Sequence, residues 1–328
     1  MKGIEQNNDF QILEIDFSKL MDLRIDFAFK LLFTKGNPRL LISLLNAIFA
    51  NKKIPRVIKS ITIKNPFMEK ESSGDKLSIL DIRAALADGT DILIEMHMYG
   101  LGELKAKTIR SWARAYGEEL DAGNSYADQP PTIVIAFANG RVESINDLTH
   151  IKSGDDKIHR LCMIMDCDDH TVFTDSMELH YIDMKAFAKT INESGCINIY
   201  DTEGILFAKW LSIITQKEIN NKNIIEDACR DEEEIRMAVS ALARQSEDKI
   251  VRQAYQRRQD EIYFYNKNIM EYKLREEELR RRAEESQRIA EEARRGEKEA
   301  RCRAEIAESE LGKKDALIAQ LKARLGEK

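Results

Sequence analysis

The distribution of proline and glycine divides this 328-residue chain into two parts of different character. All five prolines lie at or before Pro131, and glycines become rare after Gly204. Proline and glycine mark turns and loops, whereas long helices exclude them. We therefore predict helices, strands and turns in roughly the first 140 residues and helices in roughly the last 120.

The spacing of apolar residues predicts the elements of the first part. Alternation of two strands with a following helix and a further strand indicates an α/β (α+β) core, with a central mixed sheet flanked by helices. A pro-helical start signal, Asn37-Pro38, precedes the second helix. Helices are expected at 25–33, 39–50 and 104–120, and strands at 57–64, 76–86, 90–100, 132–138 and 177–184.

Two carboxylates with apolar residues on both sides, Asp81 and Glu95, lie in the predicted strands 76–86 and 90–100. Ala87-Asp88-Gly89 joins these strands, and Asp-Gly strongly favours a tight hairpin. Pairing of the strands would bring Asp81 and Glu95 close together. Each has apolar neighbours on both sides, and a carboxylate in such a strand is unfavourable unless it is paired or binds a metal. The alternative is a solvent-facing rung of the hairpin.

The spacing from Asp81 to Glu95 and His97 resembles the core of the PD-(D/E)XK nucleases. The resemblance implies that Asp81 and Glu95 hold a divalent cation, Mg²⁺ or Mn²⁺, and that the Met96 carbonyl adds a ligand. It also implies that His97 positions the attacking water. Mg²⁺ is usually held by one or two carboxylates and water, and such a metal lowers the pKa of water.

Further motifs follow one another along the chain: Asp26, Phe29 and Lys30, then Leu45-Asn46, then Arg110, Gly123 and Tyr126, then Lys185 and Phe187. Their order resembles the recombination-promoting nuclease/putative transposase family, in which a restriction-endonuclease-like fold is followed by a charged helical tail. The resemblance covers roughly residues 20–275 and implies that Asp26 approaches the metal site and that Lys30 and Arg110 contact DNA. The alternatives are an ion pair between Asp26 and Lys30 on one helix and a surface role for Arg110.

His97 stands where that family usually has Gln and the wider superfamily has Lys. An imidazole can orient water or act as a general base near neutral pH, and it can also mark an altered site. Two hypotheses follow. The first is a Mg²⁺-dependent DNA endonuclease linked to recombination or a mobile element; the second is a catalytically degenerate nuclease fold that acts as a self-associating scaffold.

A heptad seam runs through residues 249–328, and 17 of its 22 positions from Val251 to Leu325 are apolar. Such a seam is typical of a coiled coil, so we expect a homodimer through this helix. A single charged helix supported by Glu–Arg pairs is the alternative. The predicted organisation is a PD-(D/E)XK nuclease-like domain at 1–200, a helical extension at 201–248 and a charged coiled-coil tail at 249–328.

Charge is uneven along the chain. The net charge is −6, yet residues 249–328 carry 21 Lys and Arg against 17 Asp and Glu, which leaves residues 1–248 acidic. An acidic body repels DNA phosphates at long range, and a bound divalent cation would offset part of this. No apolar run reaches the roughly 20 residues of a membrane helix, and the first residues do not resemble a signal peptide, so we expect a cytoplasmic protein.

The cysteines are odd in number and scattered, which indicates reduced thiols. His159, Cys162, Cys167 and His170 have spacing that resembles a zinc site. Their intervals do not match a common zinc finger, and the segment is predicted to form a strand and a turn. Zinc therefore stays the weaker reading.

Overall fold

The computed structural model describes residues 15–50, 56–64, 81–98, 101–118, 125–142, 157–197 and 202–326. The chain divides into two compact units, one ending at Glu261 and the other beginning at Ile262. We call these the N-terminal unit and the C-terminal unit. The last helix, α8 (Lys249–Gly326), crosses the division, so its first turns belong to the N-terminal unit.

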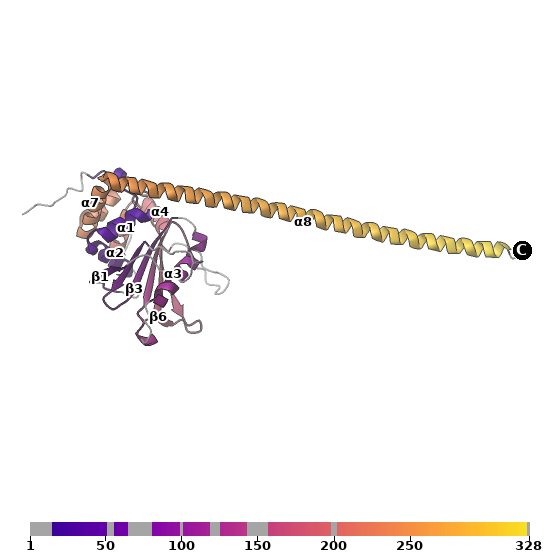
Figure 1. Cartoon of the computed structure of the whole chain (residues 1–328), viewed down its shortest axis with the longest axis horizontal. Helices are drawn as coiled ribbons and strands as arrows, with labels where there is room; N and C mark the ends of the chain where they lie inside the picture. Colours follow the sequence, from indigo (N-terminus) through magenta and orange to yellow (C-terminus); the bar gives the residue numbers. More distant parts are fainter. Residues whose placement is uncertain are drawn as a thin grey trace, which may run out of the picture. The chain divides into compact units, whose positions relative to one another are not determined.

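The core of the N-terminal unit is a six-stranded mixed sheet with the strand order β1-β2-β3-β4-β6-β5 (Figure 1). β1, β2 and β3 are antiparallel neighbours, β3, β4 and β6 are parallel, and β5 returns antiparallel to β6. The predicted mixed sheet is confirmed. Its strands are β1 (Ile61–Lys64), β2 (Ile82–Leu86), β3 (Asp91–His97), β4 (Thr132–Ala138), β5 (His159–Met165) and β6 (Val172–Asp183).

Helices cover both faces of this sheet, as the sequence predicted. The three expected helices of the first part are present, and the chain from Thr202 to Gly326 is helical apart from short connections. The helices are α1 (Asp26–Lys35), α2 (Pro38–Ala50), α3 (Leu104–Glu118), α4 (Met184–Ser194), α5 (Thr202–Ile214), α6 (Lys222–Arg230), α7 (Glu233–Glu247) and α8, with short 3₁₀ turns at Phe17–Lys19, Leu101–Glu103 and Tyr126–Asp128.

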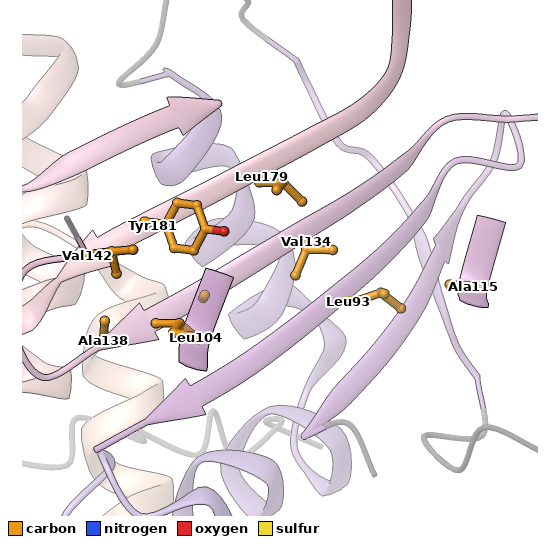
Figure 2. Packing of buried hydrophobic residues seen from close by; sticks show 9 residues of the cluster. Leu93, Leu104, Ala115, Val134, Ala138, Val142, Leu179 and Tyr181 are labelled. Carbon is orange, nitrogen blue, oxygen red and sulfur yellow. The ribbon is translucent and has the colours of Figure 1, made fainter. Parts of the chain in front are cut away.

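One face of the sheet packs against α3. Buried Leu93 on β3, Val134 on β4 and Leu179 on β6 share this face with Leu104 of α3 (Figure 2). Strand side chains alternate between faces, so Glu95 and His97 follow Leu93 on this same face. The α3 face therefore carries two residues of the predicted site.

The opposite face packs against α1, α2 and α5. The Phe29 ring of α1 lies 5.6 Å from the Phe137 ring of β4, and the Phe49 ring of α2 lies 5.4 Å from the His180 ring of β6. Burial of these aromatic side chains stabilises the fold by roughly 2 kcal/mol each. This packing also fixes α1, whose first residue is Asp26.

The β2–β3 hairpin forms as its Asp-Gly sequence predicted. Gly89 has φ +88°, a conformation in which a side chain would be strained, and Asp88 Oδ1 accepts a hydrogen bond from the Thr90 amide at 2.9 Å. The turn sets the strand register, which pairs Ile82 with Ile94. The first part of the predicted strand 76–86 lies outside the described residues.

The first turns of α8 bind the N-terminal unit directly. Tyr255 is buried, and its hydroxyl accepts a hydrogen bond from the Asp22 amide at 3.0 Å. Arg252 donates to the Lys19 carbonyl at 2.8 Å. The first positions of the predicted heptad seam therefore contact the body of the same chain. Within the part of the chain that the structure describes, no helix is both long and apolar enough to cross a membrane.

Candidate active site

Asp81 and Glu95 lie on the same face of the hairpin. The β2–β3 ladder pairs Ile82 with Ile94, and one further step in this register places Asp81 opposite Glu95. Side chains of directly opposed residues project to the same side of an antiparallel pair. Asp81 is held there because its Oδ2 accepts a hydrogen bond from the Met96 amide at 2.5 Å. The two carboxyl groups are near enough for the charge of Glu95 to raise the pKa of Asp81.

The Asp81 carboxyl is electrostatically unfavourable in its charged form. Burial raises its pKa from 3.8 to about 7, and the neighbouring charge of Asp26 is the next contribution. Glu95 raises it further, whereas the Met96 amide and the Lys30 ammonium lower it. Burial and like charges are the two causes that keep a carboxyl neutral in proteins. A cation bound at Asp81 would relieve both.

Glu95 is buried and contacts His97, two residues along the same strand. The His97 Nε2 and Glu95 Oε2 atoms lie 2.7 Å apart. The contact holds the His97 ring beside the Glu95 carboxylate. His97 is the residue that the family resemblance expected to position the attacking water. Met96 lies between them, and its amide is directed to Asp81.

Asp26 is the first residue of α1, and its charge acts on Asp81. Its Oδ1 accepts a hydrogen bond from the Phe27 amide at 2.8 Å. Arg258 of α8 donates from Nε to both Asp26 oxygens at 2.9 Å. Asp26 is thus an ion-pair partner of Arg258 as well as a neighbour of the carboxylate pair. One sign of this contact is visible in the sequence, because Arg258 is a cation at a seam position that should be apolar.

Other residues of the resemblance are placed by the structure as follows. Asn46 forms two hydrogen bonds with the backbone of Ile58, at 3.0 and 2.7 Å, and so fixes the chain that leads into β1. Phe187 is buried in α4, and Arg110 and Tyr126 are exposed. Gly123 lies outside the described residues. A DNA contact by Arg110 stays a prediction.

The weaker zinc reading finds no support in the described geometry. His159 is buried, and its Nε2 lies 2.9 Å from Nδ1 of His180 across the β5–β6 pair. Cys162 and Cys167 are exposed on β5 and the following turn. Among the residues that the structure describes, no three His, Cys, Asp or Glu side chains are grouped to hold a metal ion.

The chemistry of the Asp81 and Glu95 donor set fits a hard divalent cation. Mg²⁺ is commonly held by one or two carboxylates, with water and phosphate oxygens in the remaining positions. Carboxylate oxygens without Cys ligands favour Mg²⁺ or Mn²⁺ over zinc. The surroundings of Asp81 agree with this fit: burial first, and then the charges of Asp26 and Glu95, raise the pKa of its carboxyl.

Comparison with known proteins identifies the family. The model of the PD-(D/E)XK nuclease family transposases matches residues 23–299 of this chain. The chain belongs to this family. The matched region begins just before Asp26 and includes Asp81, Glu95 and His97. No curated protein and no solved structure matches the chain.

Membership in the PD-(D/E)XK nuclease family transposases agrees with the fold and connects the chain to nucleases and mobile elements. The match also extends into α8 as far as residue 299, so the family region includes Arg258 and part of the C-terminal unit. The nucleases of this superfamily are generally dependent on a divalent metal.

Proposed function

We propose that this protein is a metal-dependent DNA endonuclease that hydrolyses phosphodiester bonds during recombination or movement of a mobile element. The observation that carries the proposal is the convergence of Asp81 and Glu95 on one face of the hairpin. The raised pKa of Asp81 supports it, because burial first, and then the charges of Asp26 and Glu95, disfavour the ionised carboxyl unless a cation is bound.

Each side chain of the cluster has a role in this proposal. Asp81 and Glu95 hold Mg²⁺ or Mn²⁺, and the Met96 carbonyl completes the protein ligands. When bound, the metal supplies a water of lowered pKa and stabilises negative charge on the phosphate. His97 orients the water or accepts its proton, and its contact with Glu95 fixes the ring.

Lys30 and Arg110 bind DNA phosphates in this proposal. The charge of Lys30 lowers the pKa of Asp81, so Lys30 lies close to the two carboxylates that would hold the metal. A basic side chain there would counter the acidic balance of residues 1–248. Self-association through the exposed apolar side chains of α8, such as Leu311, Ile318 and Leu321, would present two such sites to one DNA.

Plasmid nicking in Mg²⁺ or Mn²⁺ tests the proposed activity. Asp81→Asn removes the central charge without changing side-chain size, and Asp88→Asn is the matched control at the turn of the same hairpin. The proposal expects nicking by the wild type and by Asp88→Asn, and a loss of about 10³-fold or more in Asp81→Asn. Equal rates for the two variants would exclude the assigned metal site.

A second function, a catalytically degenerate scaffold, is favoured by one observation. His97 replaces the usual Gln, and its ring contacts the very carboxylate that the metal needs. In this alternative the wild type and Asp81→Asn are both inactive toward DNA in every metal tested, while the chain still self-associates. Nicking that depends on Asp81 excludes it.

A further inference from the structure

Arg258 makes the most extensive contact between α8 and the residues around the candidate active site. Its Nε donates to both Asp26 oxygens at 2.9 Å, and its Nη2 donates to Oδ2 at 2.5 Å. Its Nη1 also donates to Glu261 one turn further along α8, at 2.9 Å. Asp26 and Arg258 are 232 positions apart in the chain and belong to the same compact unit.

This contact occupies the oxygens of Asp26. Oδ1 also accepts the Phe27 amide, so both oxygens have donors that fix the direction of the carboxylate. Planar guanidinium groups bind carboxylates in this two-pronged manner and set their orientation. Asp26 is thus held at a defined angle beside Asp81.

The charges around the candidate metal also depend on Arg258. Asp26, Asp81 and Glu95 bring three carboxyl groups into one region, and Lys30 supplies one cation there. Arg258 supplies a second cation through Asp26. Without it, a DNA phosphate approaching the site would meet an additional uncompensated negative charge.

Anchoring of α8 does not require Arg258. Tyr255 is buried and accepts the Asp22 amide, and Arg252 bonds to the Lys19 carbonyl. The Arg258 side chain is 41% exposed, and exposed ion pairs stabilise proteins by about 1 kcal/mol or less. The contact of Arg258 with Asp26 therefore has little value for folding alone.

We propose that Arg258 is a positioning residue of the active site: it orients Asp26 and screens its charge, so that a phosphate can approach the metal held by Asp81 and Glu95. The inference rests on the proposed endonuclease function. It makes the first turns of α8, which belong to the N-terminal unit, a part of the active site.

Kinetics of DNA nicking and binding of Mn²⁺ test this role in the full chain. The variants are Arg258→Ala, Arg258→Lys and the matched control Arg257→Ala, which removes the same charge from the neighbouring exposed position. Mn²⁺ affinity is measured by calorimetry without DNA, and thermal unfolding confirms that each variant is folded.

The inference expects kcat of Arg258→Ala to fall about 10-fold to 100-fold, the scale that misplaced catalytic groups produce. Its Mn²⁺ Kd stays equal to or below that of the wild type, because loss of a cation does not weaken binding of another cation. Arg258→Lys recovers part of kcat, since Lys restores charge without the two-pronged geometry. Arg257→Ala matches the wild type.

Three results would overturn the inference. The first is a kcat for Arg258→Ala equal to that of Arg257→Ala. The second is faster cleavage by Arg258→Ala than by the wild type, which would show that the contact with Asp26 inhibits cleavage. The third is weaker Mn²⁺ binding. If Arg258→Ala does not fold, Arg258→Lys decides by the same criteria. Absence of nicking by the wild type rejects the endonuclease and this role together, whereas Asp81-dependent nicking without an Arg258 effect rejects this role alone.

Discussion

The two ends of strand β3 each place a buried carboxylate on the same face of the sheet, and they treat it differently. At the start of the strand, Asp91 is fully buried and Arg83 donates to its Oδ2, from Nε at 2.8 Å. Lys64 lies 3.4 Å from its other oxygen. Four residues later, Glu95 meets Asp81 and His97 instead. The negative charge of Asp91 is therefore neutralised by cations, whereas Glu95 lies near a second carboxyl group, that of Asp81.

This difference separates structural from functional charge. A buried carboxylate with a matched cation stabilises the native arrangement once both are buried, and removal of the cation is strongly destabilising. A carboxyl whose pKa is raised by burial and by like charges makes the native state less favourable when it ionises. Under the proposed function, a bound cation relieves this cost. The comparison predicts that removal of a charge lowers the free energy of unfolding at the Asp91 end of the strand and does not lower it at the Asp81 end.

The largest effect is expected at the compensated end. Arg83→Met leaves Asp91 buried without its main partner, and the free energy of unfolding should fall by about 3–5 kcal/mol. Urea denaturation measures this change. Asp81→Asn, the corresponding loss of charge at the other end, should keep the stability of the wild type or exceed it at pH 8. A loss of less than 1 kcal/mol in Arg83→Met would break the comparison.

The next effect is a pH dependence that belongs to Asp81 alone. Its pKa is about 7 in the folded chain, and an unfolded Asp titrates near 3.9. The folded state therefore retains a proton that the unfolded state releases, so this contribution to stability is complete below pH 4 and is lost as pH rises through 7. It amounts to about 4 kcal/mol, because one pKa unit corresponds to about 1.4 kcal/mol.

The free energy of unfolding, measured from pH 4 to pH 8 without metal, tests whether this contribution is lost as pH rises. Relative to the wild type, Asp81→Asn should become progressively more stable across that range. Asp26, Glu95 and Lys30 face the same carboxyl and remain in both proteins, so the difference isolates Asp81. Parallel stability curves would show that the carboxyl is not perturbed.

A smaller effect is expected at His97. His97→Ala should lower nicking by about 10²-fold, as loss of a general base or of a water-orienting group does. His97→Gln, which restores the residue usual in the family, should remain within about tenfold of the wild type. Rates in Mg²⁺ across a range of pH measure both. An equal loss in the two variants would show that the imidazole itself is required.

The smallest effect is expected from the C-terminal unit. All of its described side chains are at least partly exposed, so the described part of this helix has no buried core of its own. A chain that ends at Glu261 should retain nicking within about twofold and stability within about 1 kcal/mol. Light scattering should show the proposed dimer for the full chain and a monomer for the shortened chain. A dimer that survives would place self-association elsewhere.

Local sequence patterns predicted the elements that depend on short-range order. The Asp-Gly turn fixed the register that brings Asp81 to Glu95, because fourteen residues in a tight hairpin have few alternatives. The amphipathic α2 and the apolar β4 were equally readable, since burial of one face follows from side-chain periodicity.

Long-range partners were not predictable in this way. Heptad periodicity identifies which side of α8 is apolar, and it does not say whether that side contacts a second chain or the body of the same chain. Tyr255 and Arg258 occupy the predicted seam, yet they contact Asp22 and Asp26. The burial that raises the pKa of Asp81 likewise depends on elements that the hairpin does not contain.

Calorimetric titration of the folded, metal-free protein with Mn²⁺ at pH 8 tests the central claim most directly, because it measures the cation site without requiring cleavage. The account predicts one bound ion per chain, with binding lost in Asp81→Asn and in Glu95→Gln and retained in Asp88→Asn. Absence of binding to the wild type, or binding that all three variants share, would contradict it.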